Sequence, residues 1–177
     1  MKFIYKLCAI FTLFILAYSY PAQAQSPLIS PGSSNSILIS TGMYDVFNQG
    51  DKALELRVDY RYADPLFWQL KPWFGGELTT DESFWLGSGF YTEHKLNEQL
   101  LFIPSFGVGY YDKGDSELDL DHHIEFRSQL ELAYEFNSGN RTGIYISHTS
   151  NAKLGNDNPG VEALGLYYQV PLNRLFK

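Results

Sequence analysis

Long, strict alternation of apolar and polar residues is the feature that most constrains the fold of this chain. Residues 54–62 alternate without a break from Leu54 to Tyr62, with an acidic or basic residue at every second position. Residues 124–136 repeat the pattern, and Ser128 alone interrupts the apolar parity. A period of two is that of a β-strand with one apolar and one polar face. The alternation therefore predicts an all-β fold.

The length of these runs favours a membrane barrel over a soluble sheet. A soluble β-sandwich would also alternate, but its strands are usually about 5–6 residues long. Strands of about 9–11 residues, apolar and aromatic toward lipid and polar toward the interior, are typical of transmembrane barrels. We therefore predict an eight-stranded antiparallel transmembrane β-barrel of the bacterial outer membrane. Its expected strands are 37–47, 53–62, 67–77, 83–92, 99–111, 123–136, 141–151 and 161–170.

The first 24 residues have the pattern of a secretory signal peptide. Lys2 and Lys6 precede an uncharged apolar run, which closes with a small-x-small cleavage pattern at residues 22–24. We expect residues 1–24 to be removed and residues 25–177 to form the barrel domain. The single cysteine, Cys8, lies in this segment, so the mature domain is expected to have neither a disulfide nor a catalytic thiol. The net charge of −7 argues against a nucleic-acid partner.

The lengths of the links between the expected strands predict the orientation of the barrel. The links at 112–121 and 152–160 are long and polar, whereas the link at 137–140 is short. Bacterial barrels have short periplasmic turns and longer external loops. We therefore expect both termini in the periplasm and the 152–160 loop outside the cell.

Three polar residues fall on strand faces that are otherwise apolar. His148 and Ser150 share a parity with Ile144 and Ile146, and Glu162 begins the apolar parity of the next strand. If the hairpin folds about residue 155, position 148 lies opposite position 162, where side chains are about 5 Å apart. A serine, a histidine base and an orienting carboxylate are the parts of a hydrolytic triad. The alternative is that they are ordinary polar residues near the membrane interface.

The same hairpin resembles a known family. Residues His148-Thr149-Ser150-Asn151, then Asn158-Pro159-Gly160 and Val161-Glu162, are similar to the signature of the outer-membrane lipid A 3-O-deacylases, the PagL family. Residues 40–62 are similar to that family's opening hairpin, and the resemblance extends over essentially the whole mature chain. One departure is the C-terminus: outer-membrane proteins often end in an aromatic residue, whereas this chain ends in Phe176-Lys177.

The resemblance implies a serine esterase that removes the 3-O-linked 3-hydroxyacyl chain from lipid A in the outer leaflet. It implies Ser150 as nucleophile, His148 as general base and then acid, and Glu162 as the orienting carboxylate. Asn151 is the candidate oxyanion donor, through either its side chain or its backbone N–H. No cofactor is expected. The implied partners are lipopolysaccharide and outer-membrane lipids, and a homodimer remains an open alternative.

Other interpretations stay open at this point. The chain could be a non-enzymatic small barrel with an adhesive or structural role, or a lipid A acyltransferase. The Asp and His residues of 119–123 could ligate a metal, but no matching cluster elsewhere in the sequence supports this, and we expect a solvated loop. Aromatic residues near expected strand ends are interpreted as interfacial girdles; they are Trp68, Trp73, Trp85, Tyr110 and Tyr111.

Overall fold

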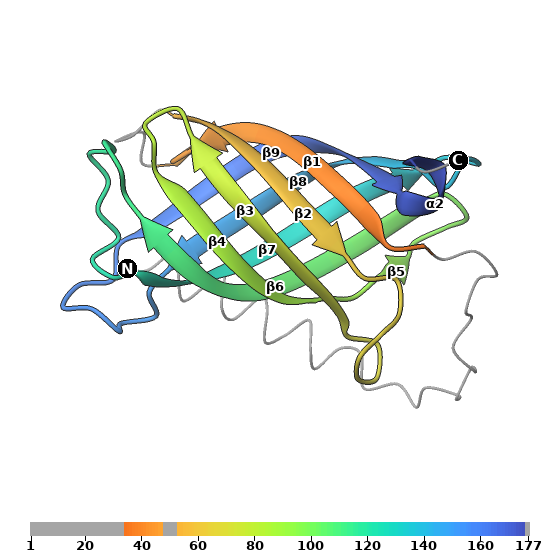
Figure 1. The fold of residues 1–177 in the computed structure, drawn as a ribbon, viewed down its shortest axis with the longest axis horizontal. Helices are drawn as coiled ribbons and strands as arrows, with labels where there is room; N and C mark the ends of the chain where they lie inside the picture. Colours follow the sequence, from red (N-terminus) through yellow and green to blue (C-terminus); the bar gives the residue numbers. More distant parts are fainter. Residues whose placement is uncertain (1–33, 48–52, 176–177) are drawn as a thin grey trace. The chain divides into compact units, whose positions relative to one another are not determined.

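The computed structural model describes residues 34–47 and 53–175, and the predicted signal peptide lies outside them. The described part is almost entirely β-structure (Figure 1). Its elements are β1 (Ser36–Tyr44), β2 (Leu54–Arg61), β3 (Lys71–Thr79), β4 (Phe84–Tyr91), β5 (His94–Lys95), β6 (Leu100–Asp112), β7 (Ile124–Glu135), β8 (Arg141–Ser150), β9 (Gly160–Pro171) and α2 (Leu172–Leu175). Within these two ranges, no helix has the length and apolar character required to cross a bilayer.

Eight long strands close into an antiparallel barrel, as predicted. Each strand pairs with its neighbours in the chain, and β1 pairs with β9 from Ser36↔Pro171 to Tyr44↔Ala163. The remaining seam joins β4 to β6. The two-residue strand β5 pairs with the beginning of β6, next to the segment of β6 that pairs with β4. It therefore extends this seam and is not a ninth strand of the barrel wall.

Two predicted strand boundaries are wrong by three residues or more. The strand expected at 37–47 ends at Tyr44, and the next residue, Asp45, has a positive φ of 52°. The strand expected at 67–77 begins instead at Lys71, because the residues before it form a tight turn. In that turn the Leu66 N–H donates to the Leu70 carbonyl at 2.9 Å, and Trp68 has a positive φ of 54°. Pro72 is tolerated inside β3 because it lies near the start of the strand, where its carbonyl accepts the Tyr62 N–H at 3.0 Å.

The inward parity of the strands carries a dense ionic network. Arg57 lies 2.7 Å from Glu55 and 2.9 Å from Glu77, and Arg61 makes a two-point contact with Glu131 at 2.6 and 3.0 Å. All five side chains are buried. A barrel of eight strands has an interior just wide enough for side chains to fill. The side chains of this network therefore pack the interior of the barrel.

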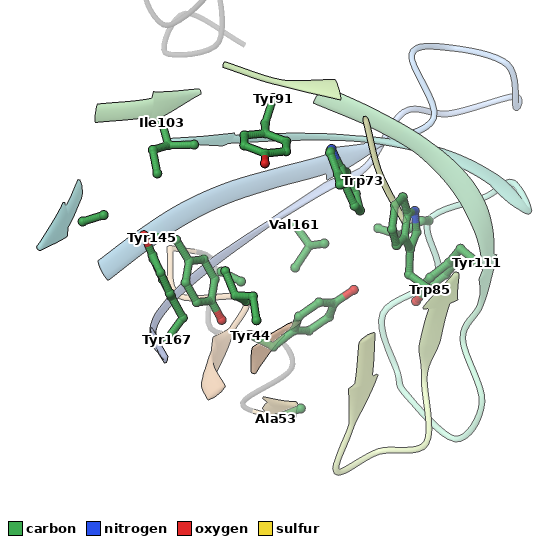
Figure 2. Packing of buried hydrophobic residues seen from close by; sticks show 14 of the residues in the cluster. Tyr44, Ala53, Trp73, Trp85, Tyr91, Ile103, Tyr111, Tyr145, Val161 and Tyr167 are labelled. Carbon is green, nitrogen blue, oxygen red and sulfur yellow. The ribbon is translucent and has the colours of Figure 1, made fainter. Parts of the chain in front are cut away.

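Aromatic residues fill the remaining interior space (Figure 2). Trp73 and Trp85 stack at 5.9 Å between ring centroids, and the Arg127 guanidinium lies over both rings at 4.8 and 4.2 Å. Our girdle interpretation is therefore wrong for Trp73, Trp85 and Tyr111, which all point inward and are buried. Trp68 and Tyr110 are exposed, as a girdle requires.

The outward parity is apolar, as the alternation predicts. The exposed side chains on the outer wall are mainly Leu, Ile, Val, Phe and Tyr, and they include Leu54, Leu56, Val58, Phe74, Leu86, Phe106, Leu132, Ile144, Leu164 and Leu166. This is the surface that a barrel presents to lipid. Any polar group on this wall therefore faces an apolar surrounding.

Candidate active site

The β8–β9 hairpin places the predicted polar residues on the outer wall. The register is the one expected from parity: His148 is the cross-strand partner of Glu162, and Ser150 is the partner of Gly160. Ser147 and Thr149, the residues on either side of His148 in the chain, are buried inside the barrel. Since successive side chains of a strand point to opposite faces, His148, Ser150 and Glu162 project outward.

His148 and Glu162 are in direct contact. The histidine Nδ1 lies 3.0 Å from Glu162 Oε1, and the two side chains are 27% and 20% exposed. An ionised carboxylate is acceptor-only, so Nδ1 is the donor of this hydrogen bond and carries the proton in the neutral ring. Nε2 is then the unprotonated nitrogen. The contact therefore prepares the imidazole to accept a proton at Nε2.

Gly160 gives the imidazole its place on the wall. A Cβ added at Gly160 would lie 2.5 Å from His148 Cε1 and 3.1 Å from Nε2, so the ring occupies the space that a side chain there would need. Gly160 is also the direct partner of Ser150. The ring therefore leans along the strand toward Ser150, with Cε1 and Nε2 over the glycine.

Ser150 is placed beside this pair by strand register. It lies two residues from His148 on the same face, a spacing of roughly 6.6 Å between Cβ atoms at the usual strand rise. Among the hydrogen bonds of residues 34–47 and 53–175, none joins Ser150 Oγ to the imidazole. Catalytic hydrogen bonds are often long without substrate and tighten in the complex. The spacing allows the Ser150 hydroxyl and the imidazole to meet when a substrate is bound.

The Asn151 side chain has its hydrogen-bonding groups in use. Its Nδ2 donates to the carbonyls of Leu120 at 2.8 Å and Asp157 at 2.9 Å, and its Oδ1 accepts the Lys153 N–H at 2.7 Å. The side chain is fully buried. Both amide hydrogens are thus engaged in joining the 113–123 and 151–159 loops. Of the two predicted donors at this residue, the backbone N–H is the one whose use leaves these contacts intact.

Two neighbours of the site escaped the sequence interpretation. Ser128, the interruption in the apolar parity of β7, is the cross-strand partner of His148. A hollow of about 190 Å³ also lies on the outer wall. It begins at Ile146 and Leu164, the next outward-facing residues after His148 on β8 and Glu162 on β9. Its lining side chains come from four strands and are Phe102, Leu130, Leu132, Ile144, Ile146 and Leu164, with Glu131 and Tyr145 behind them. The alternation of the sequence predicts that this part of the wall is apolar. It does not predict the hollow, because the depth of the hollow depends on how side chains of neighbouring strands pack.

The acidic loop, residues 112–123, is held to neighbouring segments by hydrogen bonds. Asp121 Oδ2 accepts the Asp157 N–H at 2.7 Å, and His123 Nδ1 lies 3.0 Å from the Tyr111 carbonyl. Within the part of the chain that the structure describes, no cluster of three or more His, Cys, Asp or Glu side chains could hold a metal ion.

Together, the closed barrel, its apolar wall and the polar set on that wall define a small outer-membrane barrel with a lipid-facing candidate site. Residues 48–171 match the family model described as lipid A 3-O-deacylase (PagL). The chain belongs to this family, whose members are outer-membrane hydrolases that act on lipid A. The predicted family resemblance and fold class are confirmed.

Solved structures agree with this fold. The crystal structure of the outer-membrane enzyme PagL is similar at a TM-score of 0.57 and 17% sequence identity, over 77% of this chain and 99% of that chain. A de novo designed transmembrane β-barrel is similar at a TM-score of 0.52 and 15% identity, over 78% of this chain and 96% of that chain. A search of curated proteins found no match.

Proposed function

We propose that this chain is a serine esterase that removes the 3-O-linked 3-hydroxyacyl chain from lipid A in the outer leaflet. The observation that carries the proposal is the 3.0 Å contact between His148 Nδ1 and Glu162 Oε1, next to Ser150 on the apolar wall. A carboxylate on a lipid-facing surface is destabilising. Catalysis on a substrate that is itself part of the membrane gives a reason for its presence.

The proposed reaction has two steps and uses water alone as co-substrate. Ser150 Oγ attacks the ester carbonyl while His148 Nε2 takes its proton, and the protonated imidazole then gives that proton to the departing sugar oxygen. Water attacks the resulting acyl-serine with His148 again as base, which releases the hydroxy fatty acid and regenerates Ser150. The backbone N–H of Asn151 is the proposed donor to the oxyanion.

The outer wall offers a route for the substrate. The ionic network fills the lumen, so a lipid reaches Ser150 sideways from the bilayer. The apolar hollow begins beside the site and extends from β9 across β8 and β7 to β6, and its lining suits a hydrocarbon chain. We propose that the scissile acyl chain lies in this hollow with its ester at Ser150.

The proposed orientation sets the site at the extracellular end. The 113–123 and 151–159 loops lie at this end, whereas the short 136–140 turn and α2 lie at the opposite end (Figure 1). Longer loops are external in bacterial barrels. Cleavage of the signal after Ala24 belongs to the same proposal. All three proposed catalytic residues come from one hairpin, so the proposal requires no second copy of the chain.

Mass spectrometry of lipid A tests the function directly. Cells that express the wild-type chain should yield lipid A lacking one 3-hydroxyacyl chain, compared with cells carrying the empty vector. Lipid A that gains an acyl chain would show acyl transfer instead. Unchanged lipid A, with folded barrel present in the outer membrane, would favour a non-enzymatic barrel.

Gly160→Ala should lower the rate of deacylation by about 10- to 100-fold, a loss in the range of misplaced catalytic groups. The added methyl group would collide with the imidazole at Cε1 and turn it away from Ser150. Gly76→Ala in β3 is the matched control, because its Cβ would meet nothing closer than Leu86 Cδ1 at 3.4 Å. The measurement is kcat on purified lipid A with both variants folded. Equal activities would show that the ring does not depend on this glycine.

A further inference from the structure

The loop between β2 and β3, residues 62–70, exposes three large apolar side chains at its tip. Leu66 and Phe67 are each 73% exposed and Trp68 is 81% exposed, the highest values among the large apolar residues that the structure describes. Contiguous exposed apolar groups of this kind mark a surface that contacts a partner or a membrane. The loop lies at the end of the barrel away from His148, so the proposed catalysis does not account for it.

The loop has a defined conformation. The Leu66 N–H donates to the Leu70 carbonyl at 2.9 Å, and the Leu70 N–H donates to the Phe67 carbonyl at 2.9 Å. Its base is fixed as well, because the Ala63 N–H donates to Asn35 Oδ1 at 2.9 Å and the Tyr91 hydroxyl donates to the Tyr62 carbonyl at 2.7 Å. The apolar tip is thus held in place, and its exposure is a feature of the fold.

The position of the loop points to lipid as its contact. Figure 1 shows the loop projecting sideways from the wall, away from the long axis of the barrel. Its base continues an aromatic cluster on the outer wall, in which Tyr60 stacks on Phe74 at 5.1 Å and meets Tyr62 at 5.0 Å. This wall is the lipid-contacting surface of the barrel. An indole with an apolar body and one N–H donor is the group that favours the membrane–water interface.

We propose that the 62–70 loop is a membrane anchor, in which Leu66, Phe67 and Trp68 insert into the interfacial layer of the phospholipid bilayer beside the barrel. The occupant of this apolar surface is therefore lipid, continuous with the lipid that covers the adjoining wall. The assignment to the inner leaflet rests on the proposed orientation, whereas the insertion itself does not.

The chain supplies its own reporter for this proposal. Trp73 and Trp85 are buried in the lumen beneath Arg127, so Trp68 is the indole placed to meet a lipid-borne quencher. Purified wild-type protein is reconstituted into phosphatidylcholine vesicles brominated on the acyl chains, either near the headgroup or near the chain end. We expect quenching of tryptophan emission by brominated lipid, stronger with bromine near the headgroup. Trp68→Phe should remove most of this quenching while leaving the emission of the two buried indoles.

A second variant moves the loop without touching the reporter. In Leu66→Asp/Phe67→Asp, the two charges should withdraw the tip into water, so the brominated lipids should quench Trp68 at least several-fold less. Heat-modifiable migration on a gel checks that the barrel is folded. If brominated lipid does not quench the tryptophan emission of the wild type, the proposal is overturned. This holds whether Trp68 lies in water or is covered by a second copy of the chain. Quenching that is strongest at the chain end would overturn the interfacial depth.

Discussion

Ser150→Ala is expected to abolish measurable deacylation of lipid A, with kcat falling by about 10⁴-fold or more, as in other enzymes that lose a triad nucleophile. Without Oγ no acyl-serine forms, and the remaining imidazole can only promote direct attack by water. The substrate should still bind, because the apolar hollow beside the site is unchanged. The loss should therefore appear in kcat much more than in KM.

Ser147→Ala is the matched control, since it removes a hydroxyl from the same strand but from the opposite face. Ser147 is buried and accepts a hydrogen bond from Arg57 Nη2 at 2.9 Å, inside the lumen. We expect it to retain near wild-type activity. A fluorophosphonate probe should label the wild type and Ser147→Ala at residue 150, and should leave Ser150→Ala unlabelled. Full activity in folded Ser150→Ala would refute the proposed nucleophile.

The alternation of the sequence was sufficient to predict the barrel and the face of its wall on which the candidate site residues lie. A shift of one residue in a strand moves every side chain to the other face, so parity is a strong constraint wherever one face is apolar. Parity and the glycine at 155 also predicted the pairing of His148 with Glu162, which the structure contains. The interactions that position these two residues are largely local to one hairpin.

The aromatic interior could not be predicted in the same way. Trp73 and Trp85 lie on strands that contain several glycines, where the apolar parity is interrupted, and they were assigned to the interface from their place near strand ends. In the structure both rings stand over glycines of β6, which pairs with β4 and lies one strand beyond β3. A Cβ at Gly107 would lie 2.5 Å from Trp73 Cζ2, and one at Gly109 would lie 2.5 Å from Trp85 Cε2. The glycines leave room for the indoles, a relation that depends on cross-strand register.

The role of the Asn151 side chain also depends on distant contacts. Its partners, the carbonyls of Leu120 and Asp157, belong to two different loops, and one of these loops is 31 residues away in the sequence. The family resemblance suggested Asn151 as an oxyanion donor, but it did not distinguish the side chain from the backbone. The three-dimensional contacts favour the backbone N–H for that proposed role.

Glu162→Ala is expected to lower kcat by about 10⁴-fold while leaving the barrel folded, a loss comparable to that of other triad carboxylates. The carboxylate makes the 3.0 Å contact that fixes the Nδ1–H tautomer and stabilises the imidazolium formed when Ser150 gives up its proton. Glu162→Gln should be impaired as well, because a neutral amide cannot stabilise that charge. Labelling of Ser150 by a fluorophosphonate should slow in parallel with deacylation.

Glu135→Gln provides the control for the loss of a charged partner elsewhere on the barrel. Glu135 lies 2.7 Å from Arg141 at the opposite end, so its replacement removes an ion pair without approaching the site. We expect normal activity from this variant. Glu162→Asp, which keeps the charge but shortens the reach by one methylene, should fall between Glu162→Gln and the wild type. If folded Glu162→Ala were as active as the wild type, Glu162 would be a bystander, and another group would have to orient the imidazole.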